Sequence, residues 1–284
     1  MTLCQVYNPG MKLLVLAGLL LLPFQDQDPE AALPKGSRLF RIQAADKVPI
    51  TGEIRRGNPD PTTPFLLLLH DSHSSRGEYR ELMPRLIALG FNAMAIDLRV
   101  GGKCKQVKNV TARYAQGLAN LKRSDALLDI EAALLHARAN EAHGKLFVWG
   151  SAYTASLALV AAEKHPDLVD GVIAFAPGEY FQDDGQPEHW VRDTAARVRC
   201  PVFIASEAGS EADWKPIFEA LPAELRESFV PAKGGRHGSS SLWAEVPESE
   251  EYWKALIAFL DRHVPRAPAV PEKVPPGEEP LSDG

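Results

Sequence analysis

Short apolar runs alternate with helical patterns along most of this chain, and the alternation restricts the folds open to it. The runs are too short for helices and carry few polar residues, as is typical of strands buried on both faces of a sheet. They are Phe65–Leu69, Phe91–Ile96, Lys145–Trp149, Val169–Phe175 and Pro201–Ala205, with a last short strand at Ser228–Val230. The helical patterns are Arg76–Leu89, Leu121–Arg138, Ala152–Lys164, Ala212–Leu221 and Glu248–His263. This order predicts an α/β fold with a mostly parallel central sheet and helices on both faces.

Two extended stretches precede this pattern. The segments RLFRIQA and VPITGEIRR are joined at Asp46 and Lys47, which predicts an antiparallel hairpin at the sheet edge. We therefore expect one α/β domain over residues 37–263. The segment 265–284 is rich in Pro, Glu and small residues, cannot bury apolar area, and is expected to be a disordered tail.

Residues 1–32 have a different character. Lys12 precedes the apolar run Leu13–Phe24, which is too short to span a bilayer comfortably and is followed by the acidic segment QDQDPE. This pattern predicts a signal peptide and leader, and a secreted or periplasmic protein with no stable membrane span once the leader is removed. A buried N-terminal helix or an uncleaved anchor is the alternative interpretation.

Charge and cysteine usage exclude several functions. The formal net charge is −6 and the basic residues are scattered, so no nucleic-acid partner is expected. Cys104 follows one strand and Cys200 precedes another, so in a parallel sheet they lie at opposite strand ends and are expected to be unpaired thiols. Neither has metal-ligand spacing to another Cys or His. No glycine-rich phosphate loop or dinucleotide fingerprint is present, which predicts a site without cofactor or metal.

The segment KLFVWGSAYTASLALVAAEK (145–164) reads as a strand, a sharp turn of small residues and a helix. Its turn fits the frame Gly-x-Ser-x-Gly, in which a strained strand-to-helix turn exposes a nucleophilic serine. Here Ala152 occupies the nucleophile position, and its methyl group has no lone pair and no proton to lose. Ser151 does not replace it, because Trp149 and Tyr153 would then stand where small residues are needed. Ser156 lies a turn inside the helix.

Five segments, in this order, resemble those of the α/β-hydrolase superfamily over residues 37–263. They are LLLLHDSHSSRGEY, GFNAMAIDLRVGG, WGSAYTASLAL, AFAPGEYF and RHGSSSLW, and they are most similar to small secreted dienelactone hydrolases or esterases. Members of that group carry serine at the position of Ala152. The resemblance implies an α/β-hydrolase fold. The segment between the strands that end at Phe175 and start at Pro201 is too short for a large lid, so any cap must come from Asp97–Asn120.

The resemblance also assigns roles to residues around Ala152. His237 stands at the position of the general base, and Glu207 at that of the acid, with Glu179 as an alternative. The backbone N–H groups of Tyr153 and Ser72 correspond to the oxyanion hole.

Other polar residues nearby are expected to be structural. His70 is expected to cap the end of its strand, and Asp97 and Arg99 to form an internal ion pair.

Three interpretations of Ala152 follow. In the first, the protein is by resemblance a carboxyl-ester hydrolase whose activity is weak or absent because of Ala152. In the second, it is a non-catalytic pseudo-hydrolase that binds small molecules. In the third, it is a hydrolase whose serine was replaced by engineering. In each, the expected partner is a small acyl or ester compound.

The leader generates a first prediction. If Leu13–Phe24 directs export, the mature protein begins downstream of Phe24, and N-terminal sequencing of protein recovered outside the cytosol will show this. A chain that keeps Met1 or Met11 and stays in the cytosol would contradict it.

Overall fold

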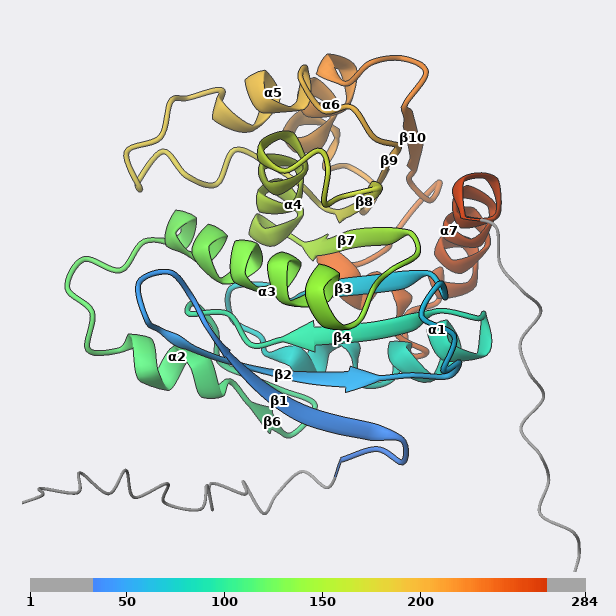
Figure 1. The fold of residues 1–284 in the computed structure, drawn as a ribbon. Helices are drawn as coiled ribbons and strands as arrows, with labels where there is room; N and C mark the ends of the chain where they lie inside the picture. Colours follow the sequence, from blue (N-terminus) through green and yellow to red (C-terminus); the bar gives the residue numbers. More distant parts are fainter. Residues whose placement is uncertain (1–32, 265–284) are drawn as a thin grey trace, which may run out of the picture.

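The computed structural model describes residues 33–264, so the predicted leader and tail lie outside the described residues. An eight-stranded sheet has the order β1-β2-β4-β3-β7-β8-β9-β10 (Figure 1). Its strands are β1 (Ser37–Gln43), β2 (Pro49–Arg55), β3 (Phe65–Leu69), β4 (Asn92–Ile96), β7 (Leu146–Ser151), β8 (Gly171–Phe175), β9 (Val202–Ala205) and β10 (Arg226–Phe229). β2 pairs antiparallel with β1 and with β4, and the pairs from β4 through β10 are parallel.

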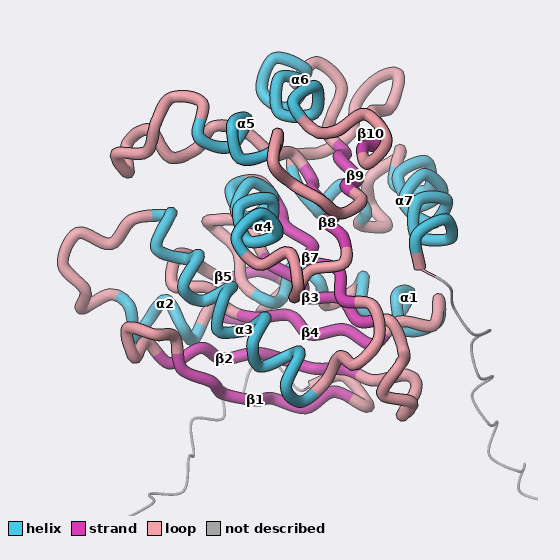
Figure 2. The backbone as a smooth tube through the Cα atoms, turned by 45° about the horizontal axis from the view of Figure 1, so that its top comes forward, coloured by secondary structure: helices cyan, strands magenta, loops and turns pink. Residues whose placement is uncertain are grey.

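Helices cover both faces of this sheet (Figure 2). One face packs against α3 (Ala126–Asn140), α4 (Tyr153–Lys164), α5 (Trp190–Ala195) and α6 (Glu211–Ala220), and the other against α1 (Leu82–Ala88) and α7 (Ser249–His263). Within β3, Leu67 points into the first layer and Leu68 into the second, as strand geometry requires. The predicted hairpin, parallel sheet and two helical layers are confirmed.

The prediction of a single helix over Arg76–Leu89 is wrong. It consists of a 3₁₀ turn, η1 (Arg76–Tyr79), followed by α1, and the Ser75 hydroxyl accepts a hydrogen bond from the Gly77 amide at the start of η1. Pro84 lies in the first turn of α1, where its missing N–H removes no helical hydrogen bond.

Several short elements were not expected. They are α2 (Val110–Ala115), α5, the small hairpin of β5 (Lys103–Cys104) and β6 (Val107–Lys108), and the 3₁₀ turn η3 (Gly238–Leu242). The expected helix Leu121–Arg138 begins instead with a 3₁₀ turn, η2 (Arg123–Asp125), which α3 follows. α2 lies along β2, where the Thr51 amide donates to Thr111 Oγ1 at 3.0 Å. Cys104 and Cys200 are free thiols, as predicted. Within residues 33–264, no helix is both long and apolar enough to cross a membrane.

β7 and α4 approach each other closely at Gly150. A Cβ atom added there would lie 2.2 Å from Thr154 O and 2.4 Å from Ala155 N, well inside van der Waals contact. Glycine therefore allows α4 to turn back onto β7, and this fixes the position of Ala152 between them.

We expect Gly150→Ala to lower the free energy of unfolding by roughly 1–3 kcal/mol or more, because backbone atoms must move to admit the methyl group. Gly117→Ala is the matched control, since an added Cβ there meets no atom within 4 Å. Urea denaturation of both variants measures the difference. Equal stabilities would contradict the packing argument.

Glu78 is buried beneath the loops that follow β3, β7 and β10. Its Oε2 accepts a hydrogen bond from the Asp71 amide at 2.9 Å, and its carboxyl group also bonds to the Ser151 hydroxyl. The Ser151 hydroxyl in turn accepts a hydrogen bond from the Ser239 amide at 2.8 Å. Burial raises the pKa of Glu78 to about 7, and the hydrogen bonds only partly oppose it.

This pKa has a consequence for stability. The folded protein binds the Glu78 proton more tightly than the unfolded chain, whose glutamates titrate at about 4.5. Stability should therefore fall as the pH rises from about 4.5 to about 7, by about 3 kcal/mol from this group alone.

Glu78→Gln, which cannot ionise, should flatten that part of the curve of unfolding free energy against pH. The exposed Glu224→Gln serves as the control and should leave the curve unchanged. Parallel curves for Glu78→Gln and the parent would show that Glu78 does not change its protonation in this range.

Candidate active site

The turn between β7 and α4 has the backbone geometry of a strained elbow. Ala152 adopts φ 54° and ψ −120°, a conformation that costs about 1–3 kcal/mol for a residue with a Cβ atom. Its amide donates to Phe175 O at 2.8 Å, and its side chain is buried. The turn therefore holds the methyl group of Ala152 where the frame read from the sequence places a nucleophile.

His237 and Glu207 come together on the loops that follow β10 and β9. His237 Nδ1 lies 3.0 Å from Glu207 Oε1. The hydrogen bond to Glu207 raises the pKa of His237 and outweighs burial. Burial raises the pKa of Glu207, but the hydrogen bond and charge of His237 outweigh it and hold this pKa below its usual value. The pair is arranged as a base and the carboxylate that orients it.

The loop that carries His237 is fixed against the elbow strand. The Ser239 amide donates to Ser151 Oγ, and Trp149 Nε1 donates to Ser239 Oγ at 2.9 Å. A Cβ atom added to Gly238 would lie 3.8 Å from the Ala152 nitrogen. The residue after His237 is thus packed directly beside the elbow.

Glu179 is used elsewhere. Its two carboxylate oxygens accept hydrogen bonds from the Val191 and Arg192 amides, at 2.9 and 2.8 Å, in the first turn of α5. Of the two candidate acids, Glu207 is therefore the one that contacts His237.

The two expected oxyanion donors differ in the structure. Tyr153 is the first residue of α4, so its amide has no partner within the helix. The Ser72 amide, in contrast, donates to Asp71 Oδ1 at 2.5 Å, and the Ser72 hydroxyl lies 3.0 Å from His73 Nδ1. The expectation of a free donor at Ser72 is therefore wrong, because the carboxylate of the preceding residue already accepts its hydrogen bond.

The remaining hydroxyls of the elbow are also engaged. The Ser151 hydroxyl is bonded to Ser239 and Glu78, and Ser156 Oγ donates to Gly178 O at 2.7 Å. Neither serine faces His237 with a free hydroxyl, in agreement with the sequence argument.

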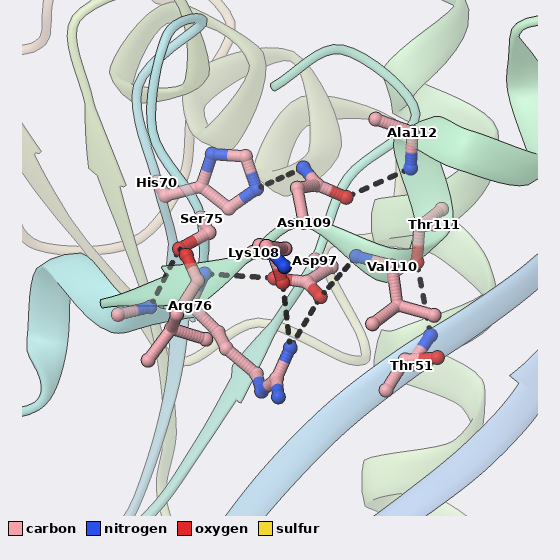
Figure 3. Close-up of polar contacts among 12 residues, drawn as sticks. Thr51, His70, Ser75, Arg76, Asp97, Lys108, Asn109, Val110, Thr111 and Ala112 are labelled. Atoms are coloured by element: carbon pink, nitrogen blue, oxygen red, sulfur yellow. Dashed lines mark hydrogen bonds and ion pairs between the residues drawn. The ribbon is translucent and has the colours of Figure 1, made fainter. Parts of the chain in front are cut away.

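His70 is structural, as expected. It lies in a buried polar cluster where its Nδ1 donates to Asp71 O at 2.7 Å and its Nε2 accepts from the Leu98 amide at 3.0 Å. Asn109 Nδ2 lies 3.2 Å from the same Nε2 (Figure 3). Both ring nitrogens are therefore occupied, and burial lowers the pKa of His70.

The expected ion pair between Asp97 and Arg99 is wrong. Asp97 Oδ2 instead lies 2.5 Å from Arg76 Nη1, within the cluster of Figure 3. Arg99 pairs with Asp46 and Asp129, at 2.7 and 2.8 Å. The two side chains diverge because Asp97 faces η1 whereas Arg99 faces α3.

Tyr180 was not identified from the sequence. Its hydroxyl donates to Ala176 O at 2.8 Å and lies 3.5 Å from His237 Nε2. The Tyr180 ring also lines a cavity of about 530 Å³ between the β8–α5 loop and α6. The pattern AFAPGEYF places this residue after a strand end, but only the folded loop brings it to His237.

Within residues 33–264, no group of three His, Cys, Asp or Glu side chains could hold a metal ion. The polar groups around the elbow include the His237–Glu207 pair, the Tyr153 amide and the Tyr180 hydroxyl.

Solved structures of esterases share this architecture. An esterase from Pyrococcus furiosus has a TM-score of 0.59 at 16% identity, over 80% of this chain and 90% of that chain. An acetyl xylan esterase from Paenibacillus sp. R4 has a TM-score of 0.58 at 18% identity, over 81% and 85%. A dienelactone hydrolase described as putative, from Klebsiella pneumoniae subsp. pneumoniae, has a TM-score of 0.57 at 16% identity, over 80% and 99%.

These likenesses show the α/β-hydrolase fold. No curated protein sequence matches the chain. Residues 60–218, more than half of the chain, match the family model of the serine aminopeptidases, S33. The protein therefore belongs to the serine aminopeptidase S33 family of α/β hydrolases.

Proposed function

We propose that this protein is an esterase-type α/β hydrolase that binds small acyl compounds at its elbow and forms no acyl-enzyme. One observation carries the proposal. The elbow keeps the strained backbone at Ala152, and the loop that carries the His237–Glu207 pair packs against it at Gly238, while residue 152 has no group that could attack a carbonyl.

The retained groups define what the site can do. With Nδ1 of His237 held by Glu207, its Nε2 is the nitrogen that would take or return a proton. The Tyr153 amide offers one donor to a carbonyl oxygen. Removing any triad member leaves a residual rate of roughly 10³–10⁴-fold over water in measured cases, so slow hydrolysis is consistent with this site and enzyme-like turnover is not.

The ligand class follows from the fold relatives. The Pyrococcus, Paenibacillus and Klebsiella proteins are named as an esterase, an acetyl xylan esterase and a dienelactone hydrolase. All three reactions involve an acyl carbon bonded to oxygen. A small ester or related acyl compound is therefore the ligand that we assign to this site.

Ala152→Ser should create measurable esterase activity on p-nitrophenyl butyrate. Loss of the nucleophile costs about 10⁶-fold in a measured triad, and an oxyanion donor about 10²–10³-fold. Because the Ser72 amide is already paired, we expect a gain of about 10³-fold over the parent. Steady-state kinetics measures the gain, and intact mass spectrometry should detect a butyryl adduct only in the variant.

Ala152→Ser combined with His237→Ala is the control and should lose the gain. A folded Ala152→Ser variant that remains as inert as the parent would overturn the esterase assignment. A parent that turns over quickly and loses this activity on His237→Ala would show that a group other than residue 152 does the chemistry.

A further inference from the structure

Asp71 lies two residues after the end of β3 and has a role that the sequence did not suggest. Its carboxylate Oδ1 accepts the Ser72 amide at 2.5 Å, and its own amide donates to Glu78 Oε2 at 2.9 Å. The buried Glu78 therefore holds the backbone of Asp71 while the side chain of Asp71 holds the next amide. This leaves the turn little freedom to reorient.

The same turn is held against the elbow. Thr154 Oγ1, in the first turn of α4, lies 2.8 Å from Leu69 O and 3.2 Å from His70 O. The last residues before Asp71 therefore contact the helix whose first amide belongs to Tyr153. Asp71 is thus carried on a segment bonded to the helix terminus that would receive a developing oxyanion.

The charge of Asp71 contributes to the raised pKa values of His237 and Tyr180. Glu207 is the main cause of the raised pKa of His237, and Asp71 adds to it. Burial is the main cause of the raised pKa of Tyr180, and Asp71 again adds to it. The Asp71 charge therefore acts on the base of the site and on the side chain beside it.

We propose that the Asp71 carboxylate caps the Ser72 amide, one of the two expected oxyanion donors, so that the site disfavours anionic ligands and slows acyl transfer independently of Ala152. This inference rests on the proposed function of the same site. An oxyanion would have to displace a carboxylate from the Ser72 amide and sit beside a like charge. Asp71 is therefore a specificity-determining residue that favours neutral acyl compounds over carboxylates.

The first test is kinetic and uses the serine variant. Asp71→Ala added to Ala152→Ser should raise kcat for p-nitrophenyl butyrate by about 10²–10³-fold over Ala152→Ser alone, the range measured for one oxyanion donor. Asp71→Asn should give a smaller gain, because it removes the charge but keeps an oxygen that the Ser72 amide can reach. Asp71→Ala in the Ala152 parent should give no such gain. Equal rates in the serine variant with and without Asp71 would overturn the inference and leave the esterase assignment intact.

The second test needs no catalysis. Calorimetric titration of the parent with butyrate should give binding at least 10-fold weaker than titration of Asp71→Ala, since only the variant has room for a carboxylate oxygen on the Ser72 amide. If Asp71→Ala fails to fold, Asp71→Gly, which also frees the Ser72 amide, supplies the comparison. Butyrate binding that is equal in the parent and the folded Asp71 variant would also overturn the inference.

Asp213→Ala is the matched control for the binding test. Asp213 also raises the pKa of His237 through its charge, but it lies in the first turn of α6 and not on the Ser72 turn. Its removal should change butyrate affinity less than 3-fold. An effect as large as that of Asp71→Ala would overturn the inference, because general repulsion and not the capping of the Ser72 amide would then exclude the anion. Should the serine variants all prove inert, the esterase assignment fails and the butyrate titrations still decide the role of Asp71.

Discussion

The backbone of Ala152 is held at positive φ by contacts that the rest of the site depends on. α4 can press against β7 only because Gly150 has no side chain, and the Ala152 amide is then directed to Phe175 O on the neighbouring strand. A glycine at residue 152 would adopt this conformation without strain, whereas alanine incurs a cost. The strain is therefore a property of the elbow and its packing, and it persists although the residue at its centre has no reactive group.

A buried polar network keeps three loops together around this elbow. Glu78 bonds to the turn after β3 and to Ser151 at the end of β7. The Ser151 hydroxyl in turn accepts a hydrogen bond from the Ser239 amide at the start of η3. Buried polar groups are costly unless each finds a partner, so such a network favours a single arrangement of the loops. This explains how His237 and Glu207, which are partly exposed, are still held at 3.0 Å from each other.

The sequence predicted the parts of the fold that leave a local pattern. Buried strands such as Phe65–Leu69 and the glycine turn at Gly150 are visible as short apolar runs and small residues, and the strand order then brings His237 to Glu207. α2 and α5 have six residues each, too few for a helical period to stand out. The partners of Asp97 and Arg99 depend on which tertiary neighbour each side chain meets. The Asp71–Ser72 contact depends on one side-chain rotamer, although a short acid beside a turn amide is a known local signal.

Under the proposed function, Ala152 and Asp71 affect different steps of acyl transfer. Without a hydroxyl at residue 152 no acyl-enzyme can form, and with a carboxylate on the Ser72 amide the charge of a tetrahedral intermediate is stabilised by the Tyr153 amide alone. Neither feature prevents a neutral carbonyl from accepting a hydrogen bond from Tyr153 beside His237. Under the proposed function, the site therefore retains groups that would bind a neutral acyl compound and lacks those that would make its reaction fast. Serine at residue 152 alone supplies the missing bond-forming group, but the intermediate that it creates would still meet the negative charge of Asp71.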